Sequence, residues 1–183
     1  MLRSYRHQYP RLGNRVYVDD SAVVIGDVEI GDDSAVWPLV VIRGDMHHIR
    51  IGKRTNIQDG SILHITHASE KTNPEGYPLI IGDDVTIGHG VILHGCTLHN
   101  VCLIGMGTII LDGAVIESEI ILGANALVPP GKRLVSGYLY VGSPVVQKRP
   151  LTTEERLFLQ YSADNYVHLK NQYLSHTPDL NDL

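Results

Sequence analysis

The sequence predicts an all-β fold with a C-terminal helix, in which hexapeptide repeats build a parallel β-helix. An aliphatic residue recurs at intervals of six over most of the chain, and the residue after it is often glycine. A small or β-branched residue fills the fifth position of the same unit, so positions one and five both point inward. A repeat this short is typical of a stacked parallel coil and not of a sandwich or barrel. The aliphatic positions are Ile30, Val36, Ile42, Ile51, Ile57, Leu63, Ile81, Ile87, Leu93, Leu98, Ile104, Ile110, Ile116, Leu122 and Val128.

The composition agrees with one domain of stacked coils. The 183 residues are enough to bury a core, and 18 glycines beside one Phe and one Trp suit tightly packed rungs. The net charge of -5 and the lack of a basic run indicate no nucleic-acid partner. No apolar stretch approaches the roughly 20 residues of a membrane span, and residues 1–7 lack the apolar core of a signal peptide. We therefore expect no membrane partner and a cytoplasmic location. Cys96 and Cys102 are expected to stay unpaired.

The β-helix domain is expected over residues 1–150, with interruptions at its corners. A three-residue insertion falls around Met46-His47-His48. A twelve-residue insertion falls within 66–77, which is polar and rich in turn residues, and it predicts a loop ejected from one corner. Single-residue deletions are expected from Ile25 to Ile30 and from Leu93 to Leu98, where a turn can absorb them.

Residues 151–183 are expected to form an amphipathic helix and a tail packed on the β-helix. The helical pattern begins at Leu151, and Thr152 with Glu155 makes a capping-box pair. The helix should run for roughly 20 residues, and the segment from Asn171 to Leu183 is expected to fray. A spacing of about four indicates the residues that would face the β-helix, which are Leu157, Tyr161, Leu169 and Tyr173.

Counting three units to a turn places the units of Ile42, Leu63, Leu93 and Ile110 on one face, with second residues Arg43, His64, His94 and Leu111. The first three of these, Arg43, His64 and His94, should form a column with the roughly 4.8 Å spacing of paired strands. His64 and His94 are 30 residues apart, but subtracting the twelve-residue insertion leaves 18, which is one full turn. Two imidazoles stacked in this way can share one metal ion.

A third histidine, His89, falls near the corner of the adjoining face. One chain is not expected to bring it to the same ion, but a threefold trimer could set it against the His64 and His94 face of the next subunit. Three neutral imidazoles and one open position form a catalytic metal arrangement, which suits zinc and also ferrous iron or cobalt. The remaining histidines have no such relation and are interpreted as surface side chains; they include His47, His48, His67, His99, His168 and His176.

Five short motifs occur in order along the chain. They are Arg43-Gly44-Asp45, Asn56-Ile57-Gln58-Asp59-Gly60, Leu63-His64, Gly88-His89 and Leu93-His94-Gly95-Cys96. This ordered set resembles the gamma-class carbonic anhydrase family, and in particular its bacterial carbonic anhydrase-like or hexapeptide-transferase-like branch. The resemblance implies a left-handed β-helix and a homotrimer. The handedness comes from the resemblance alone, because the general rule for parallel crossovers predicts right-handed turns.

Carried over by position, the resemblance makes His64 and His94 metal ligands from one subunit and His89 the ligand from its neighbour. Gln58 would hydrogen-bond the metal-bound water, and Asn56 would help to order that network. The residues that resemble the family's intersubunit ion pairs beside the site are Arg43, Asp45 and Asp59. For these three, a structural role in trimer assembly stays as open as a role in the chemistry.

The chemistry implied is reversible hydration of carbon dioxide to bicarbonate. A metal held by neutral histidines lets bound water lose a proton near neutral pH, and the hydroxide attacks carbon dioxide. Founding members of the family carry a glutamate directly after the Asp of the Arg-x-Asp motif, where this chain has Met46. A proton shuttle is therefore not evident; the candidates with a suitable ordinary pKa are His47, His48 and His67. Tyr161, Asn165 and Tyr166 could reach the pocket from the helix, with core packing as their default role.

Three functions stay open from the sequence. The first is a metal-dependent lyase that hydrates carbon dioxide, or a relative that acts on another small electrophile such as a thioester. The second is an acyltransferase that uses acyl-coenzyme A and needs no metal, against which the His64 and His94 column argues. The third is a non-catalytic trimeric metal-binding or assembly protein, which stays open because the shuttle acid is missing.

Overall fold

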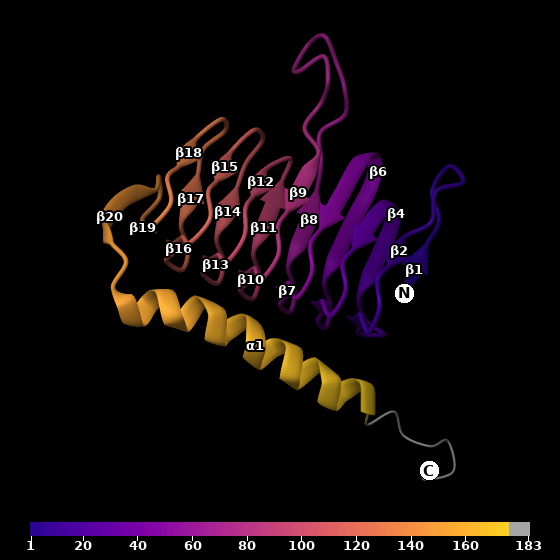
Figure 1. The fold of residues 1–183 in the computed structure, drawn as a ribbon. Coiled ribbons are helices and arrows are strands. Elements are labelled where there is room, and N and C mark those ends of the chain that lie inside the picture. The colour runs from indigo at the N-terminus through magenta and orange to yellow at the C-terminus, as the bar shows by residue number, and fades with distance from the viewer. Residues whose placement is uncertain (176–183) are drawn as a thin grey trace.

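Aliphatic residues of successive coils lie directly above one another, and this register organises the fold. The computed structural model describes residues 1–175, in which Ile42 pairs with Leu63, Leu63 with Leu93, and Leu93 with Ile110 in parallel strands. All of these side chains are fully buried. The predicted parallel β-helix is therefore confirmed, with a single long helix packed along its side (Figure 1).

Most strands are only two or three residues long, because each makes one side of a coil before the chain turns a corner. They are β1 (Leu2–Arg3), β2 (Arg11–Leu12), β3 (Tyr17–Val18), β4 (Val23–Ile30), β5 (Ala35–Val36), β6 (Val41–Ile51), β7 (Asn56–Ile57), β8 (Ile62–His64), β9 (Leu79–Ile81), β10 (Thr86–Ile87), β11 (Ile92–His94), β12 (Thr97–Leu98), β13 (Leu103–Ile104), β14 (Ile109–Ile110), β15 (Val115–Ile116), β16 (Ile121–Leu122), β17 (Leu127–Val128), β18 (Arg133–Leu134), β19 (Tyr138–Val141) and β20 (Val146–Pro150). The helix is α1 (Thr153–Ser175).

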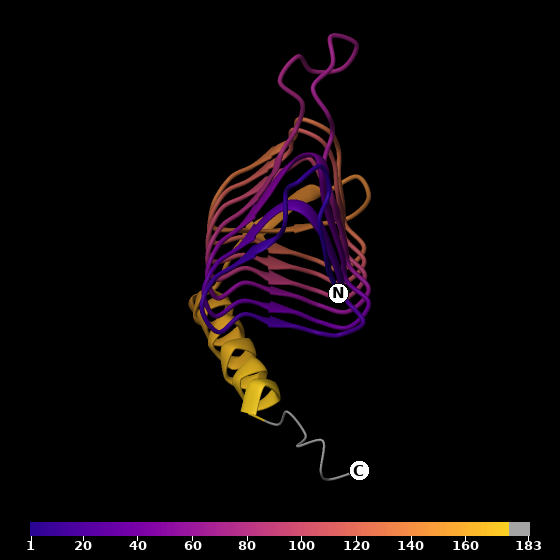
Figure 2. The same cartoon turned by 90° about the vertical axis from the view of Figure 1, so that its right-hand side faces the viewer.

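The coil has three faces, and Figure 2 shows its triangular cross-section. The histidine face consists of the first half of β4, the first half of β6, and β8, β11, β14 and β17. The open face consists of β2, the second halves of β4 and β6, and β9, β12, β15 and β18. The helix face consists of β3, β5, β7, β10, β13, β16 and β19, with β20 added antiparallel to β19.

One position of the predicted repeat is wrong. Val24, and not Ile25, pairs with Ile42 and is fully buried, whereas Ile25 pairs with Arg43 and is partly exposed. Val24 lies six residues before Ile30, so no deletion occurs there. The error arose because three consecutive β-branched residues offer two alternating registers, and only pairing with the neighbouring strand selects one.

The second predicted deletion, between Leu93 and Leu98, is confirmed. Both leucines are buried, and the chain turns between them at Gly95, which has a left-handed φ of 52°. A Cβ atom at Gly95 would come within 2.7 Å of the Tyr77 Cβ, so the shortened corner requires glycine.

Both predicted insertions leave the register of the faces intact. In the pairing of β4 with β6, Gly26 lies opposite Gly44 and Val28 opposite Ile49, so the additional residues of β6 form a bulge. The loop over 66–77 projects from the corner between β8 and β9 (Figures 1 and 2), and its base is closed by two backbone hydrogen bonds between Thr66 and Tyr77. Cys96 and Cys102 are both buried and unpaired, as expected.

Helix α1 begins with the predicted capping box. The Thr152 hydroxyl accepts the Glu155 N–H at 3.2 Å, and the Glu155 carboxylate accepts the Thr152 N–H at 2.9 Å. The helix continues through Asn171 to Ser175, so the expected fraying is wrong for these residues, and the remainder of that segment lies outside the described residues. Within residues 1–175 no helix has the length and apolar character needed to cross a bilayer.

The predicted packing face of α1 is wrong in the first half of the helix and right near its end. Leu157 and Tyr161 are 67% and 61% exposed, whereas Leu159, Ser162 and Ala163 are buried against the helix face. Tyr173 contacts the rings of Tyr17 and Trp37, with centroids 5.4 Å and 5.2 Å away, and Leu169 is partly buried. The strands under the first half of the helix carry outward polar side chains on β7 and β10, which a small hydroxyl can meet and a large apolar side chain cannot. Packing against a polar strand surface therefore overrode the apolar spacing of the sequence.

A buried lysine anchors the last turns of α1 to the first coils. The Lys170 side chain has no exposed surface, and its Nζ donates to the Arg15 carbonyl at 2.7 Å and to Asp33 Oδ1 at 2.8 Å. Hydrogen bonds from Arg15 and then Lys170 hold the pKa of Asp33 at about 2, although burial acts in the opposite direction. The charge pair therefore joins residues 137 positions apart.

Replacing this lysine should loosen the helix. In Lys170→Met the partly buried Asp33 carboxylate keeps Arg15 but loses its second cation, so we expect the free energy of unfolding to fall by about 2–3 kcal/mol. Urea unfolding followed by circular dichroism measures the change. Lys148→Met, at an exposed lysine of β20, is the matched control and should change stability little. Equal stability of the two variants would contradict the anchoring role.

Candidate metal site

His64 and His94 lie one above the other on the histidine face. They end β8 and β11, and their Cα atoms are register partners. The His64 Nδ1 and His94 Nε2 atoms are 3.1 Å apart, close to the separation of about 3.3 Å for two nitrogens on a tetrahedral zinc ion with bonds of about 2.0–2.1 Å. The predicted column is confirmed, with Arg43 on the preceding coil.

Asp45, on the preceding coil, orients the His64 ring. Its Oδ1 lies 3.2 Å from His64 Nε2, and its Oδ2 accepts a hydrogen bond from the Arg43 guanidinium. Burial raises the pKa of Asp45, but the hydrogen bonds from Arg43 and His64 outweigh it and hold that pKa below its ordinary value. A carboxylate on Nε2 assigns the proton of His64 to that nitrogen and leaves Nδ1 free to face His94.

Burial also keeps His64 neutral. It lowers the pKa of His64, and the nearby charge of Arg43 acts in the same direction, while the hydrogen bond to Asp45 acts against both. An imidazole must be neutral to bind a metal, so the lowered pKa favours the ligand form at neutral pH.

Asp112 performs the corresponding role for His94, and the sequence interpretation missed it. The His94 Nδ1 lies 2.7 Å from Asp112 Oδ1, and Asp112 Oδ2 accepts the Thr66 hydroxyl at 2.8 Å. This contact leaves His94 Nε2 free on the side of His64. The signal was available, because Asp112 is the third residue of the Ile110 unit in the same column, but only second positions were compared.

The donor pair therefore fits a metal ion but does not complete its coordination. Each of the two imidazoles is fixed by a carboxylate on one nitrogen and turns the other nitrogen toward its neighbour. Within residues 1–175, no group of three His, Cys, Asp or Glu side chains of a single chain gathers around one point. Residues 1–175 of one chain therefore supply two ligands to this point and no third.

His89 lies at the far corner of the helix face, one residue after Gly88 that follows β10. Its Nδ1 is 2.9 Å from Asp59 Oδ2, and both side chains are about half exposed. Asp59 thus pairs with His89 within one chain and not with Arg43 or Asp45. The pair repeats the arrangement of the two face histidines, with one ring nitrogen on a carboxylate and Nε2 left for another partner.

Gln58 and Asn56 lie beneath α1, on the same face as His89. The Gln58 amide donates to the Asn56 side-chain oxygen at 3.3 Å, and Asn56 donates to the Thr86 hydroxyl at 3.2 Å, which in turn meets the Ser162 hydroxyl at 2.9 Å. Gln58 is 5% exposed and Asn56 is 2% exposed. Within one chain these residues stabilise the helix contact and do not approach His64 and His94.

Of the three helix residues considered from the sequence, Tyr166 reaches this network. Burial and the charge of Asp59 raise the pKa of Tyr166, and its hydroxyl is within hydrogen-bonding reach of Gln58. Its ring also contacts Trp37, with the ring centroids 6.1 Å apart. Tyr161 and Asn165 are exposed.

The outward surface of the histidine face is apolar beside the two histidines. The sixth position of each unit points outward there, and aliphatic side chains occupy it on five successive coils. Ile62 is 45% exposed, and the others are partly exposed. Such a contiguous apolar strip is typical of a protein contact surface. The five residues are Val41, Ile62, Ile92, Ile109 and Leu127.

Both ring nitrogens of His47 make hydrogen-bond contacts. Its Nδ1 accepts the His48 backbone N–H at 2.8 Å, and its Nε2 lies 3.1 Å from the Glu75 carbonyl. These contacts tie the ejected loop to the bulge of β6. Burial lowers the pKa of His48, with the charges of Arg50 and His47 acting in the same direction, while His67 is exposed.

The chain is similar to a known protein family, to known protein sequences and to solved structures. The family described as bacterial transferase hexapeptide (six repeats) matches residues 9–44. Protein YrdA of Escherichia coli is 61% identical over 174 residues, which are 95% of this chain and 94% of that protein. A carbonic anhydrase of Geobacillus kaustophilus is 40% identical over 173 residues, 94% of this chain and 90% of that protein. A solved hexapeptide transferase family protein of Anaplasma phagocytophilum has a TM-score of 0.87 at 39% identity, covering 94% of this chain and 98% of that chain.

The orientation of His94 can be tested without metal. In the metal-free protein we expect the Nδ1–H tautomer of His94, because Asp112 accepts that proton, and long-range proton–nitrogen NMR spectra distinguish the two tautomers. Asp112→Ala should shift the ring toward the Nε2–H form. Glu70→Ala removes an exposed acid of the loop and should leave the His94 spectrum unchanged. An unaltered tautomer in Asp112→Ala would show that the carboxylate does not set it.

Proposed function

Because the chain belongs to the gamma carbonic anhydrase family, we propose that it is a metal-dependent enzyme that reversibly hydrates carbon dioxide to bicarbonate. The observation that carries the proposal is the pair of facing nitrogens on His64 and His94, each on a ring fixed by a carboxylate. An acyl transfer reaction could use one oriented histidine as a base, whereas two ring nitrogens that face each other suit a shared metal ion.

We further propose a homotrimer in which a neighbouring subunit supplies His89 as the third ligand. Two features support it: the apolar strip beside His64 and His94 is left uncovered by the described part of the chain, and His89 is half exposed with Nε2 uncommitted. A threefold axis can set the histidine face of each chain against the His89 corner of the next and close the ring.

Such packing would bring more than one residue into the shared site. Gln58, Asp59 and His89 lie on the same corner of one chain, so they would enter the neighbour's site together. There Gln58, held by Asn56, would orient a water molecule through its amide. Asp45 and Asp112 of the other chain would keep the tautomers of His64 and His94.

Zinc suits three neutral imidazoles with one open position, and ferrous iron or cobalt is compatible with the same ligands. The metal, when bound, would supply the Lewis acid that lowers the pKa of water. Arg43 lies beside the site in an ion pair with Asp45, and it would help to hold the carboxylate that orients His64.

One alternative function retains the metal site but lacks the hydration activity. Met46 stands where the family's founding members carry a glutamate, and both nitrogens of His47 are already hydrogen-bonded. A trimer that binds metal without fast hydration is therefore the second candidate. An acyltransferase is the third, since the matching repeat family and the similar solved structure are described as transferases.

Metal content and hydration decide among these functions. We expect about one metal ion per chain in protein purified without chelator, lost in His64→Ala and retained in His99→Ala, because His99 is an exposed histidine outside the site. Stopped-flow measurement should then show carbon dioxide hydration by the zinc, iron or cobalt form that exceeds the free ion. Loaded sites without hydration would favour the non-catalytic trimer. Binding of coenzyme A by a protein that takes no metal would favour the acyltransferase.

Mixed trimers test the shared site directly. His64→Ala and His89→Ala chains should each bind no metal alone. In a mixed trimer, an intact site forms wherever the face of a His89→Ala chain, which retains His64 and His94, meets the corner of a His64→Ala chain, which retains His89. Random assembly of an equal mixture should therefore restore about one quarter of the wild-type metal content.

The matched control mixes His64→Ala with His94→Ala. Both histidines lie on the same face, so every site in these trimers lacks a ligand and no metal should return. Equal metal contents in the two mixtures, with trimers present in both, would rule out a site shared between His89 and the histidine face.

A further inference from the structure

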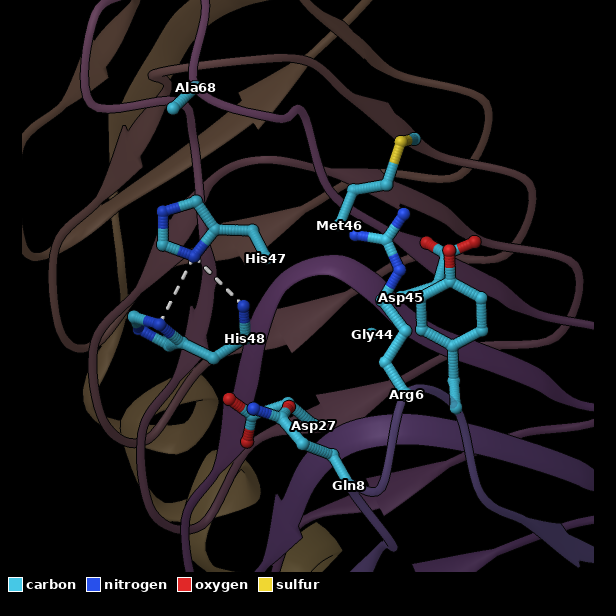
Figure 3. A pocket seen from close by; sticks show the side chains of 10 residues that line it. Arg6, Gln8, Asp27, Gly44, Asp45, Met46, His47, His48 and Ala68 are labelled. Atoms are coloured by element: carbon cyan, nitrogen blue, oxygen red, sulfur yellow. Dashed lines mark hydrogen bonds between the residues drawn. The ribbon is translucent and has the colours of Figure 1, made fainter.

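A cavity of about 380 Å³ lies beside the candidate metal site, where three irregular segments meet. The N-terminal turn at residues 5–8, the bulge of β6 and the start of the loop over 66–77 form its walls. Figure 3 shows the side chains around it, with His47 and His48 on one side and Arg6, Asp45 and Met46 on the other. The lining residues that matter for its chemistry are Arg6, Gln8, Asp27, Gly44, Asp45 and Met46.

The two carboxylates of the cavity are already paired. Asp27 accepts Arg50 Nη1 at 2.8 Å, and Asp45 is held by Arg43 and His64. Neither acid therefore needs a cation from a ligand. The cavity carries no uncompensated negative charge that would repel an anion.

Arg6, in contrast, has no carboxylate partner. Of the arginines in residues 1–175, only Arg3 and Arg6 take part in no ion pair. The Arg6 guanidinium lies 5.4 Å from the centre of the Tyr5 ring, a cation–π contact that leaves its N–H groups available. The Gln8 side chain lines the same cavity.

The turn that carries Arg6 is defined by the backbone. Tyr5 and Gln8 exchange two backbone hydrogen bonds of 2.9 Å, and the residues between them, Arg6 and His7, have left-handed φ angles of 45° and 68°. These are the angles of a type I′ turn, in which glycine or asparagine is the usual choice. The turn therefore holds an arginine at the cavity in a conformation that its backbone does not favour.

We propose that this cavity binds a small planar oxyanion of the carboxylate class, with Arg6 as its cation. A guanidinium matches the two oxygens of a carboxylate or bicarbonate through parallel hydrogen bonds, which a spherical anion cannot accept in the same way. The Gln8 amide provides a further donor. The volume exceeds that of the anion and leaves room for water or for the carbon chain of a short organic acid.

The cavity and the candidate metal site share one residue. Asp45 lines the cavity and also holds His64 through Oδ1. If the proposed hydration function holds, bicarbonate is the expected ligand, because the product would form next to a cavity that holds the Arg6 guanidinium. Binding of an organic carboxylate does not depend on that function.

NMR titration of the nitrogen-15 labelled protein tests the proposal. Sodium acetate and sodium bicarbonate are added in separate arms at constant ionic strength, with chloride as the balancing anion. We expect saturable shifts of the Gln8, Gly44 and Met46 amides with either carboxylate-class anion. Arg6→Gln should raise the dissociation constant about tenfold or more, because the charged partner is lost. Arg6→Lys, which keeps the charge without the fork, should bind with intermediate affinity.

Arg3→Gln is the matched control, since Arg3 is the other unpaired arginine and does not line the cavity; it should bind as the wild type does. The proposal is overturned if Arg6→Gln binds as tightly as Arg3→Gln, or if chloride alone produces the same shifts. Saturation by acetate and not bicarbonate would assign the site to organic acids. The same titration on His64→Ala shows whether anion binding depends on the metal site. If this variant still binds the anion while the wild type shows no hydration, the cavity site stands and the proposed function fails. If the wild type hydrates carbon dioxide but binds no anion, only the cavity site is overturned.

Discussion

The register between coils is the constraint on which the rest of the molecule depends. Successive side chains of a strand point to opposite sides, so a slip of one residue would turn every buried aliphatic side chain outward. Burial of Ile42, Leu63, Leu93 and Ile110 in one column prevents such a slip. Additional residues must therefore leave the coil at a bulge or a corner. For this reason His64 and His94 meet at 3.1 Å although 30 residues separate them in the chain.

A fixed interior leaves the outward positions free to differ from face to face. On the helix face they carry Asn56, Gln58 and Thr86, which bond to one another and to α1. On the open face Arg50 pairs with Asp27 and Glu29 in contact with water. The histidine face combines an aliphatic strip with two stacked imidazoles. The chemical character of each face is thus independent of the fold, and the site lies on a face that α1 does not cover (Figure 2).

The sequence was sufficient to predict the features that the repeat determines. It was not sufficient for features that depend on contacts between distant parts of the fold. Counting in sixes was enough to align His64 with His94 and to locate both insertions, and the Thr152 to Glu155 spacing was enough to find the helix cap. It misassigned Ile25, since the choice between Ile25 and Val24 depends on the strand that pairs with them.

The face of α1 could not be read from the spacing of Leu157 and Tyr161, because the polar strands beneath the helix select Ser162. Asp112 and the hydrogen bonds of His47 were missed for the same reason. One depends on a neighbouring coil, and the other on a carbonyl 28 residues further along the chain.

Each of the three histidines is oriented by an acid from an adjacent coil: His64 by Asp45, His94 by Asp112 and His89 by Asp59. An acid that holds an imidazole tautomer cannot also accept and release a proton without disturbing the ligand that it orients. The ring nitrogens of His47 are likewise in contact with His48 and the Glu75 carbonyl. The same hydrogen bonds that order the site therefore engage the three acids nearest to its histidines. For the proposed reaction, protons would then leave through the adjoining cavity, and their transfer to external buffer would become the slow step at saturating carbon dioxide.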